Sequence, residues 1–277
     1  MQIPRRGVLV FDSGIGGLTV LAACKRLLPR VSFYYYGDND NAPYGNLSSH
    51  CIETLSNRVL QDFAFLAPSA VVLACNTVTA VCVEKFRLRY DFPIVGAEPA
   101  VFSAAKQGGE ILVLCTRATA NSQRLLSLCR RAEACYPSSR CRIEPCDALA
   151  GEIEKRLGKG GDYEKFLPKA RPSAVVLGCT HYVYIKEFIA AYYRCPVFDG
   201  NDGIARRLKT VLAETEFSSN CLSAGRNFEK IEKARPLVTP TYSILQTGAN
   251  KGENAPIFFL GNAKTQNMGI YEQMFAK

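Results

Sequence analysis

The chain has 277 residues, of which 48% are hydrophobic and 21% are charged, and its formal net charge is +9. This composition supplies enough apolar side chains for one large or two modest folded cores, which excludes a disordered chain, and no apolar run approaches the length of a membrane span. The positive charges are scattered, without a basic run or a nucleic-acid-binding motif, so we expect a basic surface that attracts an anionic small molecule and no nucleic-acid or membrane partner.

Short apolar runs alternate with longer amphipathic stretches over the first hundred residues. This alternation predicts strands that are buried on both faces and separated by helices. The predicted strands cover residues 7–11, 31–36, 70–74 and 93–95. The predicted helices cover residues 18–28, 49–66, the stretch from the third strand to about residue 86, and residues 100–107.

The same series then starts again in the second hundred residues. The predicted strands cover residues 111–114, 141–144, 174–177 and 196–198, and the predicted helices cover residues 120–131, 148–157 and 183–193. The pattern changes after this point. It predicts a helix at 204–212, a polar irregular segment at 215–240, a lone strand at 257–260 and a last helix at 268–275.

Buried strands separated by helices predict parallel sheets with right-handed crossover connections. We therefore predict an α/β fold with two similar doubly wound parallel-sheet domains and an active site between them. The lone late strand is expected to rejoin the first sheet. The first domain would then be discontinuous and comprise residues 1–97 plus 205–277, and the second would comprise residues 98–204.

A repeated segment indicates that the two halves arose by duplication. Residues 68–75 read PSAVVLAC and residues 172–179 read PSAVVLGC, so seven of the eight positions are identical. Each copy ends in a cysteine, Cys75 or Cys179, at the end of a predicted strand. Two related halves that each present one thiol suit the transfer of a proton from one face of a carbon atom to the other.

The other cysteines favour a reducing compartment. The chain has twelve, and it is too long and too rich in apolar side chains to need disulfides for its stability. No two cysteines are spaced as C-x-x-C, and there are two histidines, so we expect no structural zinc site. The first apolar run ends at Asp12, before a glycine cluster that does not fit a signal peptide. We therefore expect a cytoplasmic protein with free thiols.

Polar side chains follow most of the predicted strands. Because ligands bind at the carboxyl ends of the strands in an open parallel sheet, these residues are the candidates for a site. In the first half they are Asp12, Ser13, Asp38, Pro43, Tyr44, Gly45, Cys75, Asn76 and Thr77. In the second half they are Thr116, Thr119, Asp147, Glu154, Cys179, Thr180 and His181.

The glycine cluster after the first strand does not match a nucleotide-binding loop. The dinucleotide fingerprint needs a third glycine where this chain has Thr19, and the phosphate-binding loop of nucleoside triphosphatases needs a lysine that is absent here. Asp12 would also face any bound phosphate. A carboxylate remains a suitable ligand, because backbone N–H groups at the start of a helix attract small anions.

The two cysteines of the repeat are predicted to be reactive. Each stands at a strand end before a predicted helix, and a helix N-terminus lowers the pKa of a thiol. Short polar residues follow each cysteine and could hold a carboxylate or an ammonium group. His181, two residues after Cys179, is predicted to titrate near the working pH. We interpret His50 as an ordinary surface or capping residue.

Six segments occur in an order and at spacings that resemble the glutamate racemases, within the cofactor-independent aspartate/glutamate racemase superfamily. They are FDSGIGGLTV, GD…APYG, ACNT, PIVG, CT-x-AT and GCTH. The resemblance covers about residues 7–205 and, more loosely, residues 257–275. The ACNT and GCTH pair is its most specific part.

The resemblance implies an enzyme with its active site between two domains. It implies that Cys75 and Cys179 exchange protons with the α-carbon of glutamate, assisted by Asp12, Asp38, Glu154 and His181. It also implies a set of residues that contact the substrate, with which we group Pro43 and His181. These are Asp12, Ser13, Pro43, Tyr44, Gly45, Asn76, Thr77, Thr116, Thr119, Thr180 and His181. We expect a homodimer whose substrate is glutamate.

Racemisation needs a base on one face of the α-carbon and an acid on the other. The resemblance implies that Cys179 deprotonates L-glutamate and that Cys75 deprotonates D-glutamate. No lysine stands at any strand end to hold pyridoxal phosphate, and the chain offers no ligand set for a catalytic metal. We therefore expect no cofactor.

The chain departs from the family pattern in its loops. The segment Asn39-Asp40-Asn41-Ala42 replaces the usual T-A-R-x, the segment at residues 96–99 is one residue short, and Tyr182-Val183-Tyr184 replaces a motif with proline and leucine. Residues 215–250 do not align with the family. Three alternatives remain open: a sister racemase of aspartate or a hydantoin, a related lyase, which needs one of the two cysteines, and a non-catalytic amino-acid-binding protein.

Overall fold

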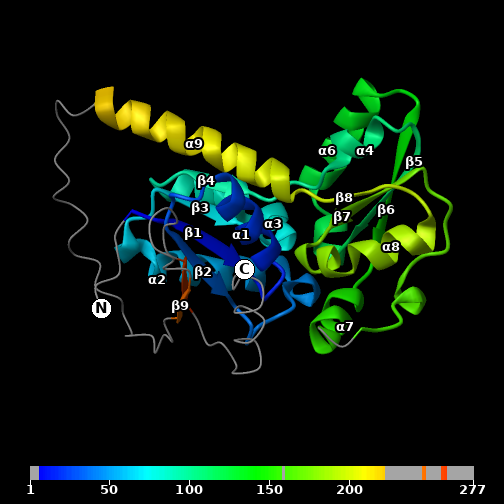
Figure 1. Cartoon of the computed structure of the whole chain (residues 1–277), viewed down its shortest axis with the longest axis horizontal. Helices are drawn as coiled ribbons and strands as arrows, with labels where there is room; N and C mark the ends of the chain where they lie inside the picture. Colours follow the sequence, from blue (N-terminus) through cyan, green and yellow to red (C-terminus); the bar gives the residue numbers. More distant parts are fainter. Residues whose placement is uncertain (1–5, 158–159, 222–244, 248–256, 261–277) are drawn as a thin grey trace.

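The computed structural model describes residues 6–157, 160–221, 245–247 and 257–260. Two sheets with helices on both faces lie side by side (Figure 1). The first sheet has the strand order β4-β3-β1-β2-β10-β9. Its strands are β1 (Val8–Asp12), β2 (Phe33–Gly37), β3 (Ala70–Leu73), β4 (Ile94–Gly96), β9 (Leu245–Thr247) and β10 (Ile257–Leu260).

The second sheet has the strand order β6-β5-β7-β8 and is parallel throughout. Its strands are β5 (Gly109–Cys115), β6 (Ser139–Pro145), β7 (Ala174–Gly178) and β8 (Val197–Phe198). The first four strands of the chain stand in the equivalent order β2-β1-β3-β4. The two halves therefore share one topology, and the predicted pair of doubly wound α/β domains is confirmed.

Helices cover both faces of each sheet. The α-helices are α1 (Leu18–Leu27), α2 (Ser49–Asp62), α3 (Asn76–Arg89), α4 (Val101–Ala105), α5 (Arg117–Ala120), α6 (Gln123–Cys135), α7 (Leu149–Arg156), α8 (Lys186–Tyr193) and α9 (Asn201–Cys221). The 3-10 helices are η1 (Tyr44–Asn46), η2 (Ala64–Leu66), η3 (Glu164–Phe166) and η4 (Thr180–Ile185). Among the described helices, none is both long enough and apolar enough to cross a membrane.

The continuous apolar run of β1 follows from burial of both faces of the first sheet. Val8 and Val10 belong to the core that contains α1 and α9, whereas Leu9 and Phe11 belong to the core that contains α2 and α3. Successive side chains of a strand point to opposite faces, so every position of β1 must be apolar until Asp12 ends it. The polar end of this strand is thereby placed at the sheet edge.

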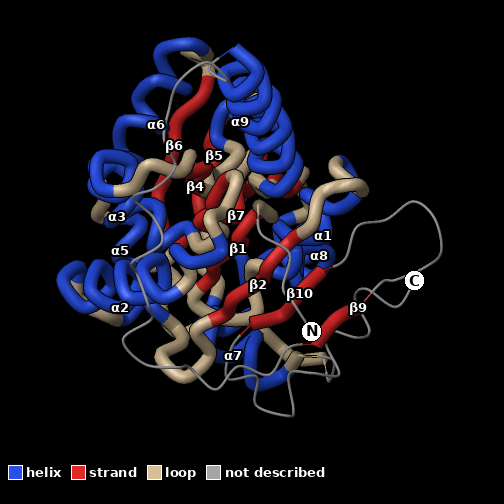
Figure 2. The backbone as a smooth tube through the Cα atoms, turned by 90° about the vertical axis from the view of Figure 1, so that its left-hand side faces the viewer, coloured by secondary structure: helices blue, strands red, loops and turns tan. Residues whose placement is uncertain are grey.

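The late strand behaves as predicted, and its partner was missed. Strand β10 pairs with β2 in parallel, so residues 257–260 do join the first sheet. Figure 2 shows β2, β10 and β9 side by side. Strand β9 pairs antiparallel with β10, which makes one edge of the sheet antiparallel. Three residues are too few to produce a recognisable alternation, so the sequence did not predict this strand.

Several helix boundaries differ from the predicted ones. Helix α9 spans residues 201–221 and packs against α1, so the predicted helix at 204–212 is too short, and the expected irregular segment at 215–240 begins as helix. Residues 222–244 and the predicted helix at 268–275 lie outside the described residues. The predicted helix at 120–131 is two helices, because the Ser122 hydroxyl caps the N-terminus of α6.

Candidate active site

The predicted site residues converge where the two sheets face each other. Asp12 ends β1, Cys75 follows β3, Thr116 follows β5, and Cys179 follows β7. Two hydrogen bonds cross between the halves: the Thr77 and Thr116 hydroxyls lie 2.9 Å apart, and the Thr180 hydroxyl donates to Asp12 Oδ2 at 3.2 Å. The carboxyl ends of both sheets therefore meet in one site, as the duplication predicted.

Asp12 is fully buried at the centre of the site. Its Oδ1 accepts a hydrogen bond from the Gly14 backbone N–H at 2.9 Å, so the glycine loop binds its own preceding carboxyl group. Burial raises the pKa of Asp12, and the nearby charge of His181 and the hydrogen bonds from Gly14 and Thr180 oppose this rise. Asp12 is therefore a carboxyl group that can gain or lose a proton inside the site.

Cys75 is buried beside Asp12 and Ser13. The Ser13 hydroxyl lies 3.3 Å from Cys75 Sγ. Burial, and then the negative charge of Asp12, raise the pKa of the thiol to about 12, against the lowering effect of Ser13 and the Val78 backbone N–H at the start of α3. The prediction that a helix N-terminus would lower this pKa is therefore wrong, because desolvation outweighs the helix.

Cys179 faces the site from the second half, with His181 and Glu154 behind it. His181 Nδ1 lies 3.9 Å from Cys179 Sγ, and His181 Nε2 lies 3.4 Å from a carboxylate oxygen of Glu154 at an angle that makes an ion pair but no hydrogen bond. Cys179 precedes the 3-10 helix η4, and α8 starts at Lys186. The predicted α-helix at 183–193 therefore begins too late to act on Cys179.

His181 is 2% exposed and is still strongly basic. Burial lowers its pKa, but the contacts with the Cys179 thiol and the Glu154 carboxyl group, together with the charges of Cys179 and Asp12, raise the pKa to about 10. The prediction that this histidine titrates near neutral pH is therefore wrong. It carries a positive charge at neutral pH and stabilises negative charge close to it.

Asp38 lies behind the site and contacts it through Tyr44. The Tyr44 hydroxyl donates a hydrogen bond to Asp38 Oδ2, and Asn41 Nδ2 donates to both oxygens of Asp38 at 3.0 Å. Burial and the charges of Asp38 and Cys75 raise the pKa of Tyr44, so its hydroxyl stays protonated. Pro43 precedes Tyr44 through a cis peptide bond. The structure records no hydrogen bond from Asp38 to either thiol.

The remaining predicted residues lie on the two sides of the interface. Thr119 accepts a hydrogen bond from the Thr116 hydroxyl at 3.0 Å, which in turn contacts Thr77. Asn76 lines a cavity of about 10 Å³ together with Cys179 and Thr180. This volume holds at most about one water molecule. The halves therefore fit closely together around the thiols, and they must separate to admit a substrate the size of an amino acid.

Other interface residues were not predicted from the sequence. The Tyr184 hydroxyl, from η4, donates to the Ile15 carbonyl in the glycine loop at 2.8 Å. Arg124, from α6, forms ion pairs with Glu84 at 2.8 Å and with Glu98 at 3.1 Å. The departure from the family pattern at Tyr184 was the one available signal. The described residues contain no group of three or more histidines, cysteines or acids that could hold a metal ion.

We expect Gly16→Ala to disrupt the closed site without unfolding the protein. A Cβ atom at Gly16 would lie 2.8 Å from Thr180 Cβ and 2.9 Å from the His181 backbone nitrogen, both in the opposite half. Because backbone cannot move as easily as a side-chain tip, the halves would be held apart and activity would fall by about 100-fold, the typical cost of misplaced reacting groups. Steady-state kinetics with the candidate substrate would measure this loss.

Gly151→Ala is the matched control, because nothing lies within 4 Å of a Cβ atom at this position of α7. We expect this variant to keep its activity and to be slightly more stable, since alanine favours a helix more than glycine does. Equal activity of the two variants would show that close approach of the halves at Gly16 is not needed.

The chain was compared with known proteins. The family model described as Asp/Glu/Hydantoin racemase matches residues 21–208. The glutamate racemase of Bifidobacterium animalis subsp. lactis is 35% identical over 217 residues, which cover 73% of this chain and 83% of that protein. The glutamate racemase of Clostridium perfringens is 35% identical over 228 residues, which cover 78% and 86%.

Solved structures agree with these sequence matches. The Escherichia coli glutamate racemase, in complex with L-glutamate and an activator, aligns with a TM-score of 0.69 at 30% identity and covers 76% of this chain and 83% of its own. The Francisella tularensis glutamate racemase, in complex with D-glutamate, aligns with a TM-score of 0.64 at 26% identity and covers 77% and 83%.

Proposed function

Since the chain belongs to the Asp/Glu/hydantoin racemase family, we propose that it is a glutamate racemase that supplies D-glutamate for peptidoglycan synthesis. The observation that carries this proposal is the position of the two thiols. Cys75 and Cys179 follow equivalent strands, β3 and β7, of two halves with the same topology, and each thiol is buried at the interface. Two opposed thiols suit inversion at one carbon.

In the proposed reaction a proton leaves one face of the α-carbon and another arrives on the opposite face. With L-glutamate, the Cys179 thiolate removes the α-proton, and the electron pair of the C–H bond stays on the substrate as a carbanion. The Cys75 thiol then donates its proton to the other face, which gives D-glutamate and a Cys75 thiolate. The reverse reaction uses the same groups in exchanged roles.

The raised pKa of Cys75, to about 12, is consistent with the role of acid in the L to D direction. Asp12, whose pKa is raised by burial, lies close enough to take part in restoring the proton. On the other side, the positive charge of His181 stabilises negative charge that develops between the thiols. The two halves therefore differ in charge although their strands are equivalent.

The carbanion is the costly species in this reaction, because the α-proton of an amino acid is only weakly acidic. Fixed positions of the reacting groups contribute roughly 7–11 kcal/mol in favourable cases. The hydroxyls of Thr77, Thr116, Thr119 and Thr180 can donate hydrogen bonds to the carboxylates of the substrate, and all four are buried. Burial strengthens these contacts because water is excluded.

We expect glutamate to be preferred over aspartate. A shorter side chain would leave buried donors of the site unpaired, at about 1–3 kcal/mol each, so two lost contacts favour glutamate by roughly 30-fold or more. The measurement is kcat/KM for both enantiomers of each acid, followed by circular dichroism and by deuterium uptake at the α-carbon in heavy water. Equal or faster turnover of aspartate would assign the chain to the sister racemases instead.

The same measurement separates the remaining alternatives. A hydantoin racemase would invert a hydantoin and leave glutamate unchanged, and a non-catalytic binding protein would produce no optical change with either. We also propose that the enzyme acts in the cytoplasm as a homodimer without a cofactor, as the family resemblance implies. Light scattering on the purified protein tests the dimer, and activity after dialysis against a chelator tests independence from metal.

A further inference from the structure

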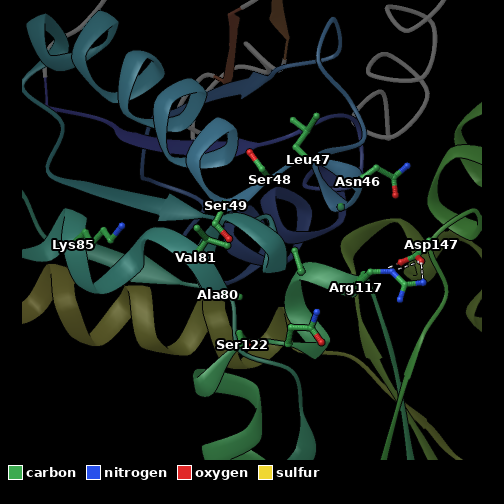
Figure 3. Close-up of a pocket in the computed structure, with 13 residues that line it drawn as sticks. Asn46, Leu47, Ser48, Ser49, Ala80, Val81, Lys85, Arg117, Ser122 and Asp147 are labelled. Carbon is green, nitrogen blue, oxygen red and sulfur yellow. Dashed lines mark hydrogen bonds and ion pairs between the residues drawn. The ribbon is translucent and has the colours of Figure 1, made fainter.

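A second, much larger pocket lies between the halves of the molecule beside the closed site. It has a volume of about 550 Å³. Ten of the residues that line it are labelled in Figure 3, with Lys85 on one side and Arg117 with Asp147 on the other. The first half contributes Gly45, Asn46, Leu47, Ser48, Ser49, Ala80, Val81 and Lys85, and the second contributes Arg117, Ala118, Asn121, Ser122 and Asp147.

The wall between this pocket and the proposed substrate site is thin. Gly45 lines the pocket and lies so close to Thr116 that a Cβ atom on Gly45 would be 2.7 Å from Thr116 Cγ2. Thr116 in turn lies 2.9 Å from Thr77, hydroxyl to hydroxyl, on the side of the site. Gly45 and Thr77 belong to the first half and Thr116 to the second, so separating the halves would join the pocket to the site.

The lining of the pocket suits a small polar anion. Serine hydroxyls and asparagine amides come from both halves, and Lys85 and Arg117 add two positive charges. The volume lies within the usual range for small-molecule sites. Apolar side chains contribute only a minority of the lining residues, which does not favour an apolar ligand.

Both cations have acidic partners that a substrate carboxylate could replace. The Arg117 guanidinium binds Asp147 Oδ2 through Nε, at 2.8 Å, and through Nη2. Lys85 pairs with Glu53, which Arg89 also approaches at 3.6 Å. The Arg117 side chain is 66% exposed and the Lys85 side chain 57% exposed, so exchange of partners costs little at these positions.

We propose that this pocket is the vestibule through which an anionic amino acid enters, and that the contact between Gly45 and Thr116 is the gate between the vestibule and the thiols. The identity of the substrate rests on the proposed function, whereas the route does not. The cavity beside Cys179 and Asn76, of about 10 Å³, is too small to serve as an entrance.

The test narrows the vestibule from either half with a bulky side chain. Ser49 and Asn121 are exposed lining residues, one from each half, so Ser49→Trp and Asn121→Trp place the indole in the pocket at little risk to the core. Iodoacetamide then reports on access, because a thiolate that reaches it displaces iodide and forms a thioether. Mass spectrometry measures the rate of this modification at each cysteine.

We expect both variants to slow the modification of Cys75 and Cys179 by about tenfold, equivalent to about 1.4 kcal/mol, and to lower kcat/KM for glutamate to a similar extent. Cys135 is exposed near the end of α6 and serves as the internal control, whose rate stays constant. Ala170→Trp is the matched variant, because Ala170 lines a separate surface pocket of the second half.

Unchanged modification of both thiols in the two vestibule variants would overturn the route. Slower modification with unchanged kcat/KM for glutamate would overturn the vestibule as the path of this substrate. If the unmodified enzyme does not racemise glutamate at all, the proposed function fails, and the rates of modification still decide the route.

Discussion

Replacement of either Cys75 or Cys179 by alanine is expected to lower kcat/KM for racemisation by at least about three orders of magnitude. Each thiol is acid in one direction and base in the other, so loss of either removes a group that both directions need. General acid–base groups contribute typically 10²- to 10⁴-fold, and groups that act as a unit lose nearly all activity together. Circular dichroism and the thermal midpoint would verify that each variant is folded.

Steady-state racemisation alone does not assign the two thiols to their faces. Two enantiomers have the same free energy, so kcat/KM for the two directions must fall equally in any variant. Exchange of the α-proton with heavy water separates the roles. We expect Cys75→Ala to retain deuterium uptake into L-glutamate through Cys179, and Cys179→Ala to retain uptake into D-glutamate through Cys75.

Cys82→Ala is the control for these variants. Cys82 is fully buried on α3, two turns after Cys75, and contributes to the core of the first half. Its replacement removes a thiol of similar burial without touching the site, so activity should remain. Near-wild-type turnover in a folded Cys75→Ala or Cys179→Ala variant would contradict the two-thiol mechanism.

The positions of the two cysteines could be predicted because strand ends are fixed by local pattern. The apolar run of each repeat defines a buried strand, and the residue after it must lie at the carboxyl edge of a sheet. Cys75 and Cys179 do stand at the edges of β3 and β7. The strand order of the two sheets followed from the same alternation, whereas β9 was too short to leave a pattern.

The proton affinities of the site could not be predicted in the same way. The pKa of Cys75 depends on how deeply the thiol is buried and on its distance from Asp12, and the sequence sets neither directly. His181 is raised by Cys179, which is close in sequence, and also by Glu154, which the fold brings from α7. Desolvation and charge from distant segments therefore decide these values.

Contacts that cross the interface were equally out of reach. Arg124 links α6 to Glu84 of α3 and to Glu98, and Tyr184 reaches the Ile15 carbonyl. Each is an ordinary polar residue in its own segment, and its partner lies far away in the sequence. Such pairs are specified by how the two halves pack against each other, which strand and helix patterns do not describe.

Replacement of His181 by asparagine is expected to lower kcat by about 100-fold, the usual cost of losing one preorganised charged or polar group at a developing negative charge. The variant removes the positive charge 3.9 Å from Cys179 Sγ and leaves Glu154 without its partner. His50→Asn is the matched control, because His50 is exposed in the first turn of α2. Steady-state kinetics in both directions measures the effect.

The pH dependence gives a second, independent readout for His181. Its pKa rises from an ordinary value of 6.5 to about 10 on folding, so the folded protein binds more protons than the unfolded chain between these values. The contribution of protonated His181 to stability is therefore fully present below about pH 6.5 and is lost as the pH rises through about 10. Denaturant unfolding of the wild type and His181→Asn should show a difference in free energy that shrinks over this range. A difference that stays constant from pH 6.5 to 10, or that grows, would contradict a protonated His181 at the site.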